Sequence, residues 1–128
     1  MFGTASYRAM GAHYRSIDIS SRVEGASPHR LIAILFEELL STIDAIAAGA
    51  RAGARKDFQR QSRAMSILHA LEASLDHERG GAVAPALAKV YRQARRLLAA
   101  GMGDGDVARI AEARGMIAEI ADAWNRIG

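Results

Sequence analysis

The sequence predicts an all-α protein, an antiparallel up-down four-helix bundle with a short N-terminal helical or irregular arm. Four segments repeat apolar residues every three and four positions, as helices with a buried face do, and they cover residues 28–50, 56–77, 82–100 and 105–127. Turns of only a few residues join them, and short connections favour antiparallel neighbours. The alternation typical of strands is missing. We therefore expect a single-domain bundle over residues 27–128, preceded by a mobile arm over residues 1–26.

The segment 28–50 has a clear start signal and a surplus of apolar surface. Ser27 can accept a hydrogen bond from a free amide of the first turn, and Pro28 loses no hydrogen bond at the first helical position. The apolar residues form two adjacent stripes, one with Leu31, Leu35, Leu39 and Ile46 and the other with Ile32, Phe36, Leu40 and Ile43. One stripe is enough for a helix that packs on one side. Two stripes indicate a helix packed on two sides, or one that offers a stripe to a partner.

The other three helical segments each carry a stripe that we expect to face the core. In the segment 56–77 the stripe consists of Phe58, Met65, Leu68, Leu71 and Leu75. In the segment 82–100 it consists of Val83, Leu87, Val90, Tyr91, Ala94, Leu97 and Leu98. In the segment 105–127 it consists of Val107, Ile110, Ile117, Ile120, Trp124 and Ile127. Small residues at inward positions, which would let helices approach closely, are Ala33, Ala47, Ala64, Ala94 and Ala113.

Glycines mark the connections between the helices. Gly80 suits the left-handed residue that closes a helix, and the run 101–106, with three glycines, is expected to form a turn in which Asp104 caps the last helix. The arm that precedes the bundle carries isolated apolar residues, which are Ile17, Ile19 and Val23. We expect this arm to lie in an apolar groove for part of the time.

Composition and charge exclude several classes of protein. The chain has 128 residues, half of them apolar, enough for one domain with a core. It lacks cysteine, which excludes disulfides and thiolate metal sites. The longest apolar run, Leu31 to Phe36, is far shorter than the roughly 20 residues of a membrane helix, and the first ten residues do not resemble a signal peptide. We expect a soluble protein that does not insert into membranes.

Two other functions remain as alternatives on the residues alone. A metal- or cofactor-using bundle enzyme would need convergent polar groups, but the four histidines fall on different segments and the Glu-x-x-His pattern of di-metal bundles does not occur. A basic nucleic-acid-associated bundle would use the net charge of +3 and the arginines near residues 51–63 and 92–96. The aromatic residues on which single-stranded bases stack are nearly absent there. We expect no cofactor, no metal and no nucleic acid.

Four motifs occur in chain order, and together they carry a family resemblance. They are Ala-Ser-Pro-His-Arg-Leu-Ile at 26–32 with Leu-Phe-Glu at 35–37, Leu-Asp-His-Glu-Arg-Gly-Gly at 75–81 followed by Val83, Ala84 and Leu87, Tyr91 with Arg-Arg-Leu at 95–97, and Ala-Asp-Ala-Trp at 121–124. In this order and with these turn lengths, the chain resembles the flagellar secretion chaperones of the FliS family. Each motif alone is weak, whereas the set spans about 100 residues.

The resemblance implies a function and a set of contact residues. It implies a non-enzymatic cytoplasmic chaperone that binds the disordered C-terminal segment of flagellin in apolar grooves, prevents its premature polymerisation and assists its secretion. The flagellar export machinery and a co-chaperone are further candidate partners. The residues that we expect to contact a partner are Tyr14, Ile17, Ile19, Leu31, Leu35, Leu39, Leu75, Leu87, Tyr91, Leu98 and Trp124.

Overall fold

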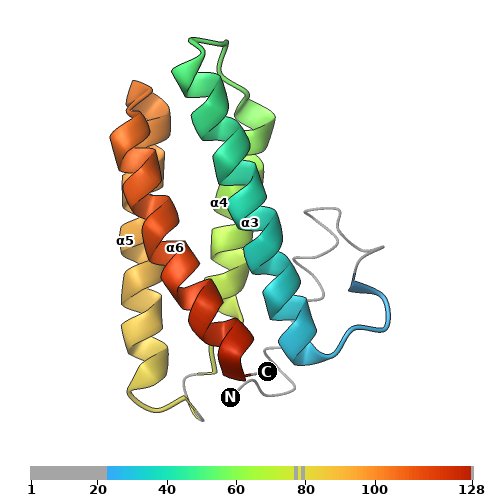
Figure 1. Cartoon of the computed structure of the whole chain (residues 1–128). Coiled ribbons are helices and arrows are strands. Elements are labelled where there is room, and N and C mark those ends of the chain that lie inside the picture. Colours follow the sequence, from blue (N-terminus) through green and yellow to red (C-terminus); the bar gives the residue numbers. More distant parts are fainter. Residues whose placement is uncertain (1–22, 77, 79, 128) are drawn as a thin grey trace.

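The computed structural model describes residues 23–76, 78 and 80–127. Within these ranges the chain forms no strand and four helices, α3 (Pro28–Arg51), α4 (Phe58–Ala73), α5 (Val83–Asp104) and α6 (Val107–Ile127). Successive helices run in opposite directions, and α3 packs against α4 and α6, while α5 packs against the same two helices (Figure 1). The predicted all-α four-helix bundle is confirmed. Of the expected arm, residues 1–22 lie outside the described residues, and Val23 and Ala26 pack against the core.

Helix α3 begins as its sequence predicts. The Ser27 side chain accepts a hydrogen bond from the amide of Arg30 at 3.2 Å, and Pro28 occupies the first turn. Every residue from Leu31 to Phe36 is buried. One of the two apolar stripes is buried except for the half-buried Ile46, and the other except for the half-buried Leu40. Packing against two neighbouring helices therefore accounts for both stripes.

Small side chains are spread through the core, as predicted. All five alanines expected at inward positions are buried: Ala33, Ala47, Ala64, Ala94 and Ala113. Between them lie large aliphatic side chains that are almost fully buried, among them Ile32, Leu35, Ile67, Leu98 and Ile117. Alternating large and small residues let side chains of facing helices interdigitate, which is how dense cores are built.

Three residues expected in the core are exposed. Phe58 is 72% exposed, Val83 55% and Ile127 72%. Each is the first or last residue of its helix, since α4 begins at Phe58, α5 begins at Val83 and α6 ends at Ile127. Helical periodicity gives the direction of a side chain but not whether a neighbouring helix extends far enough to cover it. The prediction that these three residues face the core is wrong for this reason.

The connection between the last two helices is shorter than expected. Helix α5 continues through Gly101 and Met102, both buried, to Asp104, and Gly105 closes it with a φ of 66°. Asp106, not Asp104, caps α6, because its carboxylate accepts hydrogen bonds from the amides of Ala108 at 3.1 Å and Arg109 at 3.3 Å. The predicted turn over residues 101–106 is therefore wrong.

The turn before α5 also differs in one detail. The left-handed residue there is Gly81, with a φ of 52°, and not Gly80. Gly80 is required for a different reason, because a Cβ at that position would lie 2.6 Å from the carbonyl oxygen of Asp76. The close approach of two backbone segments, rather than backbone conformation, excludes a side chain at Gly80.

Candidate partner-binding site

The structure gathers most of the predicted contact residues into one core. Seven of them are buried, namely Leu31, Leu35, Leu39, Leu75, Tyr91, Leu98 and Trp124. Leu87 is half-buried and packs against the same cluster. Tyr14, Ile17 and Ile19 lie outside the described residues. The assignment of these eleven residues to partner binding stays a prediction. Of the eight predicted contact residues that the structure describes, only Leu87 is more than slightly exposed to a molecule bound outside.

Burial has a direct effect on the chemistry of Tyr91. The side chain is 4% exposed, and desolvation raises the pKa of its hydroxyl far above the ordinary value near 10. The phenol therefore stays neutral at physiological pH. Tyr91 packs as a core residue at the middle of α5 and presents no reactive group to a partner.

A reciprocal contact joins the start of α3 to the end of α6. The indole Nε1 of Trp124 donates a hydrogen bond to the carbonyl oxygen of His29 at 3.0 Å. The Nε2 atom of His29 lies 2.9 Å from the carbonyl oxygen of Trp124, and because a carbonyl oxygen only accepts, this nitrogen carries the proton. The two rings stack with their centroids 4.6 Å apart and an interplanar angle of 7°. We call this pair the His29–Trp124 clasp.

Two ion pairs show which side of α5 faces α4. Arg92 and Arg95 lie 3.9 and 3.3 Å from the carboxylate of Glu72 on α4. The helical repeat places Leu87, Val90 and Leu97 on the other side of the buried stripe that contains Tyr91 and Leu98. These three residues are half-buried and therefore flank α5 on the side of α6.

Another ion pair shows which side of α6 faces α3. Arg114 donates to the Asp44 carboxylate on α3 from Nε at 2.6 Å, and this hydrogen bond raises the pKa of Arg114, further securing its charge. Met116 and Ile120 lie on the opposite side of the buried Ile117, facing away from α3 and toward α5. Both are half-buried.

The helical repeat therefore places these residues along the outer edge of the junction between α5 and α6. We define this surface, the α5–α6 seam, by the half-buried Leu87, Val90, Leu97, Met116 and Ile120 and the exposed Val83 and Ile127. Val83 and Ile127 lie at the same end of the bundle, because α5 begins where α6 ends (Figure 1). A row of partly exposed apolar side chains between two helices is a surface on which an amphipathic helix can pack.

The sequence contained the signal for this seam but could not separate it from the core. Val83, Leu87, Val90 and Leu97 recur at helical spacing and were assigned inward together with Tyr91 and Leu98. The two stripes are adjacent on the helix, and which of them lies deeper depends on where α4 and α6 pack against α5. Of the seam, only Leu87 was among the predicted contact residues.

Charged groups of the described residues form several ion pairs at the surface. The part of the chain that the structure describes holds no group of three histidine, aspartate or glutamate side chains placed to bind a metal ion. None of its helices is long and apolar enough to cross a membrane. Four residues of the basic runs have an ion-pair partner: Arg60 beside Asp57, Arg63 beside Glu38, and Arg92 and Arg95 beside Glu72. These pairs stabilise the bundle surface.

Comparison with known proteins gives this bundle a family. A family model described as "Flagellar protein FliS" matches residues 10–128. This chain belongs to the FliS family. A FliS-family relative from Salmonella typhimurium strain LT2, the "Flagellar secretion chaperone FliS", is 34% identical over 134 residues, covering 94% of this chain and 92% of the relative. The "Flagellar secretion chaperone FliSB" of Pseudomonas aeruginosa strain PAO1 is 26% identical over 118 residues, covering 89% and 91%.

Membership of the FliS family confirms the resemblance that the four sequence motifs carried. The match includes all four motifs, because it runs from residue 10 to the end of the chain. FliS proteins are chaperones, which implies a binding function rather than an enzymatic one. The family model and the two relatives together support a flagellar secretion chaperone.

Proposed function

We propose that this protein is a cytoplasmic export chaperone for flagellin, which binds the disordered C-terminal segment of flagellin, prevents its premature polymerisation and assists its secretion. The observation that carries the proposal is the FliS-family match over residues 10–128. An all-helical bundle with a partly exposed apolar seam fits this role, because a disordered client can fold as a helix on such a surface.

The α5–α6 seam is the surface on which we expect part of the client to pack. Four of its half-buried side chains have already lost much of their contact with water and pack against the core, namely Leu87, Leu97, Met116 and Ile120. A client helix that covers them completes their burial without unfolding the bundle. The buried residues that are predicted to contact a partner, such as Leu35 and Leu98, then contribute indirectly, because their packing holds the helices of the bundle in place.

Calorimetric titration of the protein with a peptide from the C-terminus of the host's flagellin tests the proposal. We expect saturable one-to-one binding with a strongly negative heat-capacity change, because apolar burial lowers the heat capacity and the client folds as it binds. Absence of heat, together with an unchanged melting temperature in excess peptide, would contradict flagellin as the client. The fold and the family assignment would stand after such a result.

Two exposed residues of the seam allow a sharper test. In the double variant Val83→Glu and Ile127→Glu, we expect the affinity for the flagellin peptide to fall about tenfold, since each change places a charge in an apolar contact. Neither side chain contributes much to the core, so the melting temperature should change little. Phe58→Glu is the matched control, because Phe58 is as exposed as Ile127 but lies at the other end of the bundle. Equal losses in both variants would remove the seam from the proposal.

We further propose that the N-terminal arm competes with the client for apolar surface. The proposal is supported by Val23 and Ala26, which precede α3 and pack against the core, and by the apolar Ile17 and Ile19 in the sequence before them. A chain that begins at Ala26 should bind the flagellin peptide more tightly and aggregate faster than the full-length chain. Unchanged affinity together with unchanged aggregation would reject the competing arm.

A further inference from the structure

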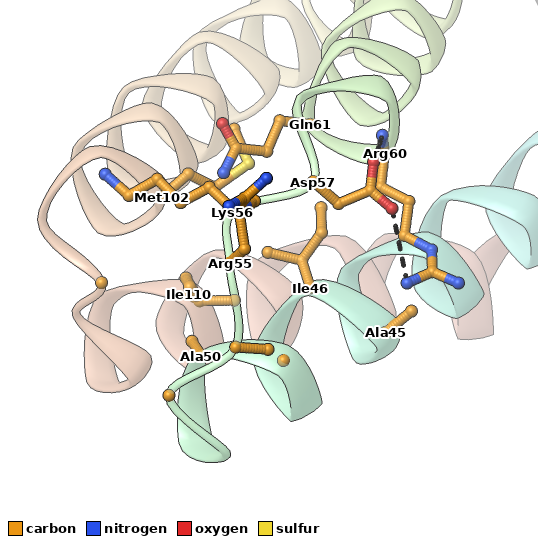
Figure 2. A pocket seen from close by; sticks show the side chains of 14 residues that line it. Ala45, Ile46, Ala50, Arg55, Lys56, Asp57, Arg60, Gln61, Met102 and Ile110 are labelled. Atoms are coloured by element: carbon orange, nitrogen blue, oxygen red, sulfur yellow. Dashed lines mark hydrogen bonds and ion pairs between the residues drawn. The ribbon is translucent and has the colours of Figure 1, made fainter.

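A cavity lies at the end of the bundle where α3 ends and α4 begins. Its volume is about 350 Å³, within the usual size range of ligand pockets. Figure 2 shows the side chains that line it, which come from α3, the connection to α4, the start of α4, the end of α5 and the start of α6. Ile46, Met102 and Ile110 supply an apolar interior, together with Ala45 and Ala50. Met102 and Ile110 are themselves buried, so this interior is part of the rigid core.

The charges at the cavity are mostly positive. Arg55, Lys56 and Arg60 line it, and Asp57 is the single acidic lining residue. Asp57 is already engaged, since its carboxylate caps α4 by accepting from the Arg60 amide at 3.1 Å and lies 3.6 Å from the Arg60 guanidinium. Lys56 donates to the carbonyl oxygen of Gly103, which ties the connection to the end of α5. Among the described residues, Arg55 has no ion-pair or hydrogen-bond partner, and it is exposed.

The wall of the cavity leaves backbone open to a ligand. Gly49, Gly53 and Gly105 line it, and a Cβ added at any of them would meet no atom within 4 Å. An occupant can therefore approach the main chain closely at these points. The cavity combines an apolar interior, accessible backbone and an excess of cationic side chains.

We propose that this cavity, the cationic end pocket, binds an acidic peptide segment that inserts one aliphatic side chain between Ile46, Met102 and Ile110. Carboxylates that flank the inserted residue would pair with Arg55 and with the ammonium group of Lys56. The apolar interior requires an apolar anchor, and the cationic rim selects neighbours of negative charge. The site lies at the opposite end of the bundle from Val83 and Ile127, so a partner here can bind while the α5–α6 seam is occupied.

The composition of the pocket favours a peptide over a nucleic acid. None of its described lining residues is aromatic, so bases would have no ring on which to stack. Arg60 already pairs with Asp57, so only Arg55 and Lys56 keep an uncompensated charge, which suits a short acidic segment better than the run of phosphates of a nucleic acid. An aliphatic anchor, in contrast, uses the interior that the core provides. The inference does not depend on the identity of the client at the seam.

Fluorescence anisotropy with the full-length protein can test the pocket. The probe is a fluorescein-labelled peptide in which one leucine is flanked on each side by a pair of glutamates. We expect saturable binding that weakens about tenfold when the leucine is replaced by glycine, because glycine has no side chain to bury in the apolar interior. Replacing the glutamates by glutamine should also weaken binding, and binding of the acidic peptide should decrease as salt is added.

Variants of the protein assign the binding to this pocket. Gly49→Phe should abolish binding, because the new side chain grows from the cavity wall into open space, whereas Gly49→Ala should bind like the original chain. Arg55→Glu should weaken binding about fivefold or more, as expected for loss of an exposed ion pair and introduction of repulsion. Arg126→Glu at the far end of α6 is the control for a change in net charge and should leave binding unchanged.

Several results would overturn the proposal. They are no binding of the probe, equal binding of the glycine-substituted peptide, undiminished binding by a folded Gly49→Phe variant, and equal losses in Arg55→Glu and Arg126→Glu. An oligothymidylate strand that binds as tightly as the peptide and competes with it would point to a nucleic acid instead. Circular dichroism shows whether each variant is folded. Gly49→Ala shows whether replacing the helical glycine alone affects binding, as distinct from filling the cavity with the phenylalanine ring. Loss of flagellin binding at the seam would leave this test intact.

Discussion

At the scale of single residues, the His29–Trp124 clasp joins the first helix of the described bundle to the last. It combines two side chain to backbone hydrogen bonds with one stacked ring pair, across 95 positions of sequence. His29→Ala should lower the free energy of unfolding by about 1–2 kcal/mol, because a hydrogen bond and the stack are lost together. Urea unfolding followed by circular dichroism measures this loss.

A double-mutant cycle separates the clasp from simple packing. Trp124→Phe removes the indole donor and keeps a ring, so the effects of His29→Ala and Trp124→Phe should fall short of additivity when combined. Asn125→Ala, an exposed neighbour on α6, should cost little. Additive effects of the two substitutions would mean that the rings do not stabilise one another.

Tyr91 gives the protein a pH dependence at the alkaline end. Burial raises the pKa of its hydroxyl, so above about pH 10 the unfolded chain releases a proton that the folded chain keeps. The stabilisation is complete below pH 10 and declines as the pH rises further. Melting temperatures between pH 8 and pH 11 should therefore fall less steeply for Tyr91→Phe than for the original chain. Parallel curves for the two proteins would contradict the burial of an ionisable hydroxyl.

At the scale of the helices, Gly101 decides how α5 meets α6. A Cβ there would lie 2.9 Å from Cγ1 of Ile110, 3.0 Å from the Ile110 amide and 3.1 Å from the carbonyl oxygen of Asp106. Two of these atoms belong to the backbone at the start of α6 and cannot rotate away. Gly101→Ala should therefore destabilise the bundle by about 1–3 kcal/mol.

Gly49 is the matched control for this element. It also lies within a helix, and a Cβ there would meet no atom within 4 Å. Gly49→Ala should stabilise the protein by up to about 1 kcal/mol, because alanine loses less backbone entropy in a helix than glycine does. The two alanine variants should thus shift the urea midpoint in opposite directions. If Gly101→Ala raised the urea midpoint as Gly49→Ala does, the close approach of α5 and α6 would be relaxed in solution.

At the scale of the whole molecule, the four helices are not held equally. Helix α4 is the shortest, and its interface with α5 is the sparsest of the four neighbouring interfaces, while α3 has the most buried residues. Opening α4 therefore exposes the least apolar surface. In hydrogen exchange followed by mass spectrometry, peptides from α4 should exchange before peptides from α3. Earlier exchange in α3 would contradict this order.

Ion pairs between α4 and α5 add to the sparse packing interface between these two helices. One carboxylate oxygen of Glu72 is buried and accepts no directed hydrogen bond, yet it lies 3.3 Å from the Arg95 guanidinium. The attraction of the opposite charge offsets the lost hydration without fixing one geometry. This junction therefore tolerates small shifts between α4 and α5, in contrast to the close backbone contact at Gly101.

Helices and their starts could be predicted because they depend on neighbours in the sequence. Ser27 caps the amide three residues later, and inward alanines such as Ala64 and Ala113 recur at the helical period. The family could also be identified from short motifs in the right order. The exposure of the predicted contact residues could not be predicted in the same way. Most of them are buried in the core, and helical spacing alone does not distinguish a fully buried stripe from a half-buried one.

By itself, the sequence determined the helical class, the antiparallel order of the bundle and the family, since local periodicity, short connections and motif order are all properties of the linear chain. Only the tertiary structure decided that Phe58, Val83 and Ile127 are exposed and that Gly101 belongs inside α5. It also decided that the α5–α6 seam and the cationic end pocket exist. The reason is physical: exposure, close approach and cavities depend on where a second helix lies, and that position is set by packing between residues far apart in the chain.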